Sequence, residues 1–140
     1  MSVELTGWVE NDVAARRTAT GGLSRQKILE AAAELFAERG FDGAGVDEIA
    51  RRAGVNKAML YYHVGDKAAL YGQVVMGFIA EVRAEIEARV ARATMPTAKL
   101  AAMQQAFVAW ALRTPSYPRI MLREISLGGV NLPQEATGEM

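Results

Sequence analysis

Apolar residues recur at helical spacing through residues 46–64, in two short runs that a glycine separates. In the first run the three- and four-residue steps place them on one face of a short helix. Gly54 can take the left-handed conformation that ends a helix, and Asn56 can cap the next helix through its side-chain oxygen. In the second run Leu60 and Val64 face the same side. The pattern therefore predicts two short helices joined by a tight turn, which is a helix-turn-helix.

The outward face of the second helix has an unusual composition. With its apolar pair turned inward, the 3.6-residue period leaves Ala58 and Tyr62 outward, flanked by Met59 and Tyr61. A solvated helix face normally carries Lys, Glu and Gln, whereas this one offers a methyl group, a thioether and two phenols. The basic residues that border it are Lys57, His63 and Lys67. Such a face suits a DNA major groove, although tyrosines packed under a neighbouring helix would explain the same residues.

A longer helix is predicted before this pair. Apolar residues recur at helical spacing from Ile28 to Phe36, Ser24 is a suitable N-cap, and Gly40 can end the helix. Phe41 is then expected to fold back and complete a three-helix core. The glutamates on the outward face of this helix lack a nearby nucleophile or metal-ligand set, so we interpret them as solvated residues and predict no enzymatic activity.

Residues 1–22 show no sustained period and end in two glycines, which predicts a flexible arm. Arg16 and Arg17 could add DNA contacts, as basic arms do, and a solvated leader without a role is an equal alternative. In both interpretations the folded part of the chain begins near residue 23.

After the helix-turn-helix, Asp66 is placed to cap a long helix whose apolar residues recur every four residues as far as Val90. We expect this helix to be the lever between the DNA-binding domain and the rest of the chain. Pro96 is well placed to begin another helix, and a last helix is predicted for residues 117–127. Residues 131–140 are mostly polar, and we expect a frayed tail there.

Composition and charge restrict the possible functions. The chain has 140 residues, 51% hydrophobic and 23% charged, which is typical of a globular protein. With no cysteine and one histidine, it has no material for a disulfide framework or a Cys- or His-based metal site, and we expect no cofactor. Sixteen basic and sixteen acidic residues cancel, but basic residues are concentrated in residues 13–29 and 51–59, as docking on phosphate requires.

The N-terminal segment has no basic start followed by an apolar run, and no apolar stretch approaches the length of a bilayer. We therefore expect a cytoplasmic protein that makes no membrane contact. Because helical spacing recurs along the chain, the predicted fold class is all-α.

Two longer motifs lie within residues 24–71. They are Phe-Ala-x-x-Gly-Phe at residues 36–41 and Leu-Tyr-x-His-x-x-x-Lys at residues 60–67. With them, this segment resembles the DNA-binding domain of the TetR family of bacterial transcriptional regulators. The resemblance implies base contacts from Lys57, Ala58, Met59 and Tyr62, and phosphate contacts from Tyr61, His63 and Lys67. Gly45 stands where the family usually has a threonine that caps the second helix and contacts phosphate, so here the backbone amide alone must serve.

The resemblance also implies a role for the following helices. TetR-like proteins bind small apolar or amphipathic inducers between them, and the implied ligand-binding residues are Phe78, Met103, Phe107, Trp110 and Met121. Helical spacing alone favours a core position over a pocket for residues such as Phe107 and Trp110. Family members continue through several more helices, two of which form the dimer interface. We therefore expect a shortened regulatory domain that dimerises only if those helices are supplied or replaced.

The expected organisation is a flexible arm over residues 1–22, a three-helix helix-turn-helix DNA-binding domain over residues 23–68, and a partial helical ligand-binding and dimerisation domain over residues 69–140. The leading hypothesis for function is a transcriptional regulator that binds a palindromic operator in double-stranded DNA. We expect it to be a repressor that a small-molecule inducer releases. The alternative is a helical ligand-binding or interaction fragment of such a regulator that does not bind DNA productively.

Overall fold

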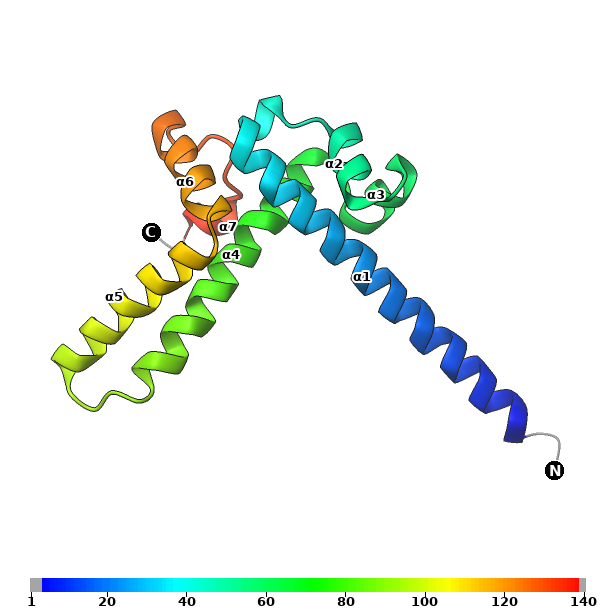
Figure 1. The fold of residues 1–140 in the computed structure, drawn as a ribbon, viewed down its shortest axis with the longest axis horizontal. Coiled ribbons are helices and arrows are strands. Elements are labelled where there is room, and N and C mark those ends of the chain that lie inside the picture. Colours follow the sequence, from blue (N-terminus) through cyan, green and yellow to red (C-terminus); the bar gives the residue numbers. More distant parts are fainter. Residues whose placement is uncertain (1–3, 139–140) are drawn as a thin grey trace.

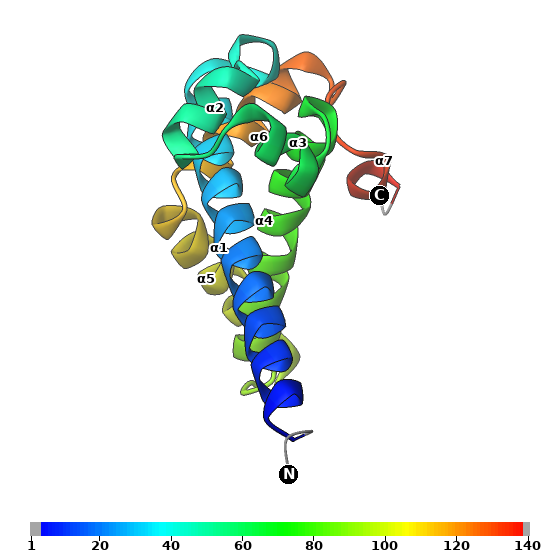
Figure 2. The ribbon, with the colours of Figure 1, turned by 90° about the vertical axis from the view of Figure 1, so that its right-hand side faces the viewer.

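The computed structural model describes residues 4–138, with side chains from residue 21 onward (Figure 1). The seven helices of these residues are α1 (Glu4–Gly43), α2 (Val46–Ala53), α3 (Lys57–Val64), α4 (Lys67–Val90), α5 (Pro96–Arg113), α6 (Ser116–Leu127) and α7 (Gln134–Thr137). The predicted all-α class is confirmed. α2, α3 and α6 lie near the place where α1 and α4 meet, whereas the start of α1 and the α4–α5 connection lie at opposite ends of the molecule (Figure 1). In Figure 2, turned by 90°, both of these ends lie below α2, α3 and α6.

The first helix differs from the prediction at its start. α1 begins at Glu4, so Ser24 lies inside the helix and does not cap it. No proline interrupts this stretch, and an interior glycine such as Gly21 or Gly22 costs only about 1 kcal/mol relative to alanine. The segment predicted as an irregular arm is therefore helical from Glu4. Residues 1–3 and the side chains of Arg16 and Arg17 lie outside the described part, so contacts of these arginines with DNA stay a prediction.

We call residues 21–74 the head, because α1, α2, α3 and the first turns of α4 enclose one apolar core. Gly40 has a φ of 75°, a conformation that favours glycine, and it lets the end of α1 bend back. Phe41 consequently stacks on Phe36 with ring centroids 6.2 Å apart and meets the edge of Tyr71 at 5.1 Å. Core side chains with no exposed surface are Ile28, Ala32, Leu35, Phe36, Ala44, Ile49, Leu60 and Leu70. The expected return of Phe41 to the core is thus confirmed.

We call residues 75–138 the body. α4 and α5 pack against each other, and α6 returns to pack against the end of α1. The body core is aromatic: Trp110 meets Phe78 at 6.0 Å and Tyr117 at 4.6 Å between ring centroids. The tail predicted to fray instead contains α7, and Leu132 packs against the core just before it. In the described residues, no helix combines the length and the apolarity needed to cross a bilayer.

Candidate nucleic-acid interface

The helix-turn-helix is held by local hydrogen bonds that its sequence supplies. Gly54 ends α2 with a φ of 71°, and its amide donates to the Arg51 carbonyl oxygen at 3.2 Å. The Val55 amide donates to the Ala50 carbonyl oxygen at 3.0 Å, which closes the turn. Asn56 Oδ1 then accepts from the Met59 amide at 2.7 Å and caps α3. Both predicted capping roles are confirmed, and these bonds fix the start of α3 relative to the end of α2.

The outward face of α3 is open. Leu60 and Val64 are buried in the head core, whereas Tyr62 on the opposite face is 85% exposed. Met59 and Tyr61 beside it are 41% and 44% exposed, and Ala58 is also exposed. Tyr62 is therefore not packed under a neighbouring helix in the described part of the chain, as one interpretation of the sequence allowed. The face offers aromatic rings and a methyl group to a partner.

The basic residues that border this face already have partners on the protein. Lys57 Nζ lies 3.1 Å from Asp47 Oδ1, and this bond raises the pKa of the lysine. Lys67 Nζ donates to the Asp42 carbonyl oxygen at 3.4 Å and lies 4.8 Å from the centre of the Phe41 ring. Both interactions are exposed or long, so each can be exchanged for a phosphate or base at small cost. His63 is half-buried between α3 and the early part of α1.

The arginines at the end of α2 contribute less free positive charge than their sequence suggests. Arg51 forms two bonds to the Glu48 carboxylate, at 2.6 and 3.0 Å, and these hold the pKa of Glu48 below its usual value. Arg52 likewise forms two hydrogen bonds to the carboxylate of Glu38 on α1, at 2.9 and 3.1 Å, and these bonds lower the pKa of Glu38. The Arg52–Glu38 pair joins α1 to α2, whereas the Arg51–Glu48 pair lies within α2. The basic segment predicted over residues 51–59 is thus partly neutralised by acidic neighbours from outside it.

Gly45 precedes α2 and provides no side-chain cap, as the sequence implied. Its φ of −87° and ψ of 140° suit any residue, and a side chain added there would meet no atom within 4 Å. The amides of the first turn of α2 therefore remain directed outward at the positive end of the helix dipole. The same turn carries Asp47 and Glu48, whose carboxylates are paired with Lys57 and Arg51.

The residues predicted to bind a ligand fall into two groups. Phe78 and Trp110 are buried, at 8% and 4% exposed, and pack edge to face in the body core. Met103 and Phe107 are exposed on α5, although Phe107 contacts Tyr117 with ring centroids 6.4 Å apart. The fifth, Met121, is half-buried on α6. Sequence reasoning omitted Tyr117, which contacts three aromatic rings of this cluster.

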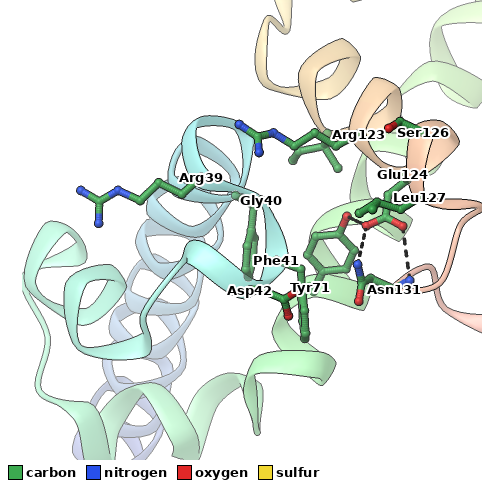
Figure 3. Close-up of a pocket in the computed structure, with 12 residues that line it drawn as sticks. Arg39, Gly40, Phe41, Asp42, Tyr71, Arg123, Glu124, Ser126, Leu127 and Asn131 are labelled. Atoms are coloured by element: carbon green, nitrogen blue, oxygen red, sulfur yellow. Dashed lines mark hydrogen bonds between the residues drawn. The ribbon is translucent and has the colours of Figure 1, made fainter.

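Sequence reasoning also missed a polar joint between head and body (Figure 3). Glu124 on α6 is 2% exposed, and its Oε1 accepts from the Tyr71 hydroxyl of α4 at 2.6 Å. Asn131 donates to the same carboxylate from its side chain at 3.1 Å and from its amide at 3.3 Å. The joint borders a hollow of about 280 Å³ between α1, α4 and α6. Burial, together with the bond to Glu124, raises the pKa of Tyr71.

One sequence signal could have revealed this joint. Glu124 lies four residues after Ile120 and seven after Tyr117, which is the apolar side of α6. An acidic residue on a buried face needs hydrogen-bond donors, so it predicts a polar contact there. Arg123 beside it donates from Nη2 to the Glu38 carbonyl oxygen at 2.7 Å and joins α6 to the end of α1.

Comparison with known proteins finds relatives that are named as transcriptional regulators. The HTH-type transcriptional activator FasR of Mycolicibacterium smegmatis is 37% identical over 83 residues, which cover 59% of this chain and 38% of FasR. The negative transcriptional regulator IcaR of the Staphylococcus aureus biofilm operon icaADBC is 43% identical over 51 residues, 36% of this chain and 27% of IcaR. A solved tetR family transcription regulator from Shewanella sp. PV-4 has a TM-score of 0.70 and 28% identity, covering 80% of this chain and 58% of its own.

The fold and the open face of α3 define an all-helical protein with an N-terminal helix-turn-helix domain of the DNA-binding type, followed by a helical domain. Residues 28–74 match the model of the bacterial regulatory proteins of the tetR family. This segment of the chain is therefore a DNA-binding domain of the TetR family type, as its motifs implied. The chain spans less than two thirds of the length of each relative named above.

Proposed function

We propose that this protein is a DNA-binding transcriptional regulator whose helix α3 enters the major groove. The observation that supports this most is the exposure of Tyr62, 85%, on a helix whose opposite face is fixed in the head core. A buried anchor with an open aromatic face is the arrangement that a recognition helix needs. The similarity of the chain to the regulators FasR and IcaR supports the same function.

In this proposal the first turn of α3 contacts base edges. Lys57 exchanges its exposed bond to Asp47 for a base acceptor, Ala58 and Met59 contact thymine methyls, and Tyr62 lies between them and the groove wall. Because the Lys57–Asp47 pair is exposed on both sides, breaking it costs little. The sequence preference of the protein then depends on these side chains.

Phosphates on either side of the groove hold the head in place. In this proposal the Tyr61 hydroxyl, His63 and Lys67, which border the α3 face, contact phosphates beside the groove. On the other side, the Gly45 amide and the first turn of α2 offer donors at the positive end of a helix. These contacts are independent of sequence and weaken as salt rises.

The proposal is tested by selecting bound duplexes from a random-sequence library with the full chain, and then with Lys57→Ala and Tyr62→Ala. We expect the parent to enrich one sequence, and the variants to lose discrimination at the contacted base pairs by up to about 1–3 kcal/mol. Leu112→Ala, which removes an exposed apolar side chain from α5, is the matched control and should leave the preference unchanged. An identical preferred sequence in all four proteins would remove α3 from the interface.

Failure of the parent to enrich any sequence would favour the alternative, a helical fragment without productive DNA binding. A single head makes few phosphate contacts, and a dimer gains affinity by binding two half-sites together. We therefore propose that the operator is palindromic and that a homodimer binds it in the cytoplasm. Sizing the protein with the selected duplex should show two copies per duplex.

We propose repression as the direction of regulation. IcaR is named a negative regulator and FasR an activator, so the names of the relatives favour neither direction. A reporter gene placed behind the selected site decides: expression should fall when the protein is present. A rise in expression would make the protein an activator, and DNA binding by α3 would stand.

We further propose that a small apolar or amphipathic inducer binds between α4 and α5. Phe78 and Trp110 would form the floor of this site, Met103 and Phe107 its open edge, and Met121 its side toward α6. Phe107→Ala should abolish the ligand-induced rise in melting temperature across a panel of such compounds while DNA binding without ligand persists. A folded Phe107→Ala protein that responds like the parent to every compound would exclude this site.

A further inference from the structure

Gln73 on α4 is half-buried, and both ends of its side-chain amide are bonded to other helices. Its Nε2 donates to the Val64 carbonyl oxygen at 2.8 Å. Val64 is the last residue of α3, where helix carbonyls have no partner within the helix. The Gln73 amide thus supplies a donor that the recognition helix itself lacks, and it joins the end of α3 to α4.

The other end of the same amide contacts α1. Gln73 Oε1 accepts from Arg25 Nη2 at 2.6 Å, a short bond whose donor is charged. Because the guanidinium orients the amide, the nitrogen of Gln73 is directed at Val64 and not at solvent. One side chain therefore connects three helices: α1, α3 and α4.

α1 also passes close to the same end of α3. A side-chain carbon added at Gly21 would lie 3.7 Å from His63 Cε1. Arg25 is one helical turn further along α1, and it therefore lies beside the border of the open α3 face. The bonds of Gln73 would therefore transmit a change in the angle of α4 to the residues that we propose to contact DNA.

We propose that Gln73 is a positioning residue that sets the orientation of α3 for DNA recognition, with Arg25 holding its amide in place. This inference rests on the proposed DNA-binding function. Gln73 does not contact DNA; it fixes the last turn of α3 to α4 and α1, so that the side chains of the α3 face meet the groove in one arrangement. Loss of either bond widens the range of α3 orientations and lowers discrimination between sequences.

Three variants separate the two bonds. Gln73→Met keeps the volume of the side chain and removes both bonds. Gln73→Glu keeps an acceptor for Arg25 but has no donor for the Val64 carbonyl oxygen. Arg25→Gln removes the charged donor at an exposed position and leaves Gln73 unchanged. Gln105→Met, the same change at an exposed position on α5, is the matched control.

The test measures, for the full chain, the ratio of affinities for the site that the parent selects and for a scrambled duplex of equal length. Gln73→Met and Gln73→Glu should lower this ratio about two- to tenfold, the effect of one hydrogen bond, with scrambled-duplex binding and salt dependence unchanged. Arg25→Gln should lower it less, and Gln105→Met should leave it unchanged. A residue that only stabilised the fold would lower the melting temperature without changing the ratio in folded protein.

Two results would overturn the proposal. One is an unchanged ratio in both Gln73 variants. The other is a fall of about one unit in the slope of log affinity against log salt for Arg25→Gln, together with an unchanged affinity ratio for Gln73→Met. Arg25 would then contact a phosphate itself. Should Gln73→Met fail to fold, Gln73→Glu and Arg25→Gln carry the same comparison.

Hydrogen–deuterium exchange without DNA separates failure of this inference from failure of the proposed function. Fraying of the last turn of α3 should speed amide exchange in α3 about two- to tenfold in Gln73→Met, and leave exchange in α5 as in the parent. If the parent selects no DNA sequence, the proposed function fails. The hydrogen–deuterium exchange measurement then tests by itself whether Gln73 positions α3. Equal α3 exchange in Gln73→Met and the parent would then overturn the positioning role.

Discussion

The head and the body expose apolar side chains in different ways. From α2 onward in the head, the large apolar residues that remain exposed are Met59, Tyr61 and Tyr62, and all three lie on α3. In the body most of them lie on α5 and α6, with Leu112 of α5 79% exposed and Ile125 of α6 73% exposed, and others lie on α4 and in the connections, at Met76, Met95 and Val130. From α2 to residue 74, the exposed large apolar side chains of the head are confined to the α3 face that we propose binds DNA. In the body, such side chains are spread over several elements.

This difference has a physical cause. The head closes its core with the second half of α1, the short helices α2 and α3 and the start of α4, so a side chain left outside is not needed for packing. In the body, α4 and α5 share an aromatic core, but the outer side of α5 is not covered by another described helix. Exposed apolar residues therefore indicate a binding face in the head more strongly than they do in the body.

The largest expected effect is on stability. Leu60→Ala removes a side chain with no exposed surface from the head core, which should lower the free energy of unfolding by about 2–5 kcal/mol. Leu112→Ala, at an exposed position on α5, should change it by less than about 0.5 kcal/mol. Urea unfolding of the two variants and the parent measures both. Similar losses in the two variants would show that the head and the outer side of α5 do not differ in packing.

The joint between head and body should give the next largest effect. Tyr71→Phe removes the hydroxyl that donates to the buried Glu124 carboxylate, which should cost about 1–3 kcal/mol at pH 7. Tyr117→Phe, whose hydroxyl has no described bond to a carboxylate, should cost less. Urea unfolding again measures the difference, and equal losses would show that the bond to Glu124 contributes nothing.

The pH dependence of stability sharpens the same comparison. The pKa of Tyr71 is raised above its ordinary value of 10.0 by burial and by the bond to Glu124. The folded state therefore holds this proton more tightly than the unfolded state, so the stabilisation is complete below pH 10 and declines above it. The parent should lose stability between pH 10 and 11 more steeply than Tyr71→Phe. Parallel declines would exclude Tyr71 as the titrating group.

A smaller effect is expected on DNA binding at the border of the α3 face. Lys67→Ala should weaken binding to all sequences alike and reduce the slope of log affinity against log salt by about one unit. Lys67 also contacts Asp42 and Phe41, so a purely structural role would lower the melting temperature and leave the salt slope unchanged. Anisotropy titrations at several salt concentrations distinguish the two roles.

The smallest effect is expected at the start of α2. Gly45→Ser adds a capping hydroxyl in open space, which should raise the free energy of unfolding by a few tenths of a kcal/mol. The same hydroxyl can donate to a phosphate, so DNA affinity should rise slightly. Gly45→Ala, which adds a side chain without a hydroxyl, should increase neither quantity. A matching rise in the alanine variant would attribute the effect to lost chain entropy instead.

Local residues decided which parts of the fold could be predicted. α2 and α3 begin and end as expected because Gly54 and Asn56 act within a few residues of themselves. The predicted start of α1 was wrong. No strong helix-breaking residue lies between Glu4 and Gly22, and a possible cap such as Ser24 does not force a helix to begin. Helix ends set by weak preferences cannot be placed from sequence alone.

The candidate site also has parts that could be predicted from the sequence and parts that could not. The open face of α3 follows from helical period and two buried residues, so its members could be named before the structure. The bonds of Lys57, Lys67 and Gln73 could not, because their partners come from other elements. The Tyr71–Glu124 bond joins residues 53 positions apart, and only the acidic residue on the apolar side of α6 indicated it.

The central claim is that the head binds DNA through α3 and the start of α2, and that the exposed apolar surface of the body does not. Backbone amide chemical shifts of the full chain, titrated with the selected duplex and with a scrambled one, test it most directly. We predict that both duplexes shift Gly45 and the first turn of α2, that the shifts specific to the selected duplex are concentrated in α3, and that α5 and the outer side of α6 are unchanged by either duplex. Shifts concentrated in α5 and α6, with α3 unchanged, would contradict the claim.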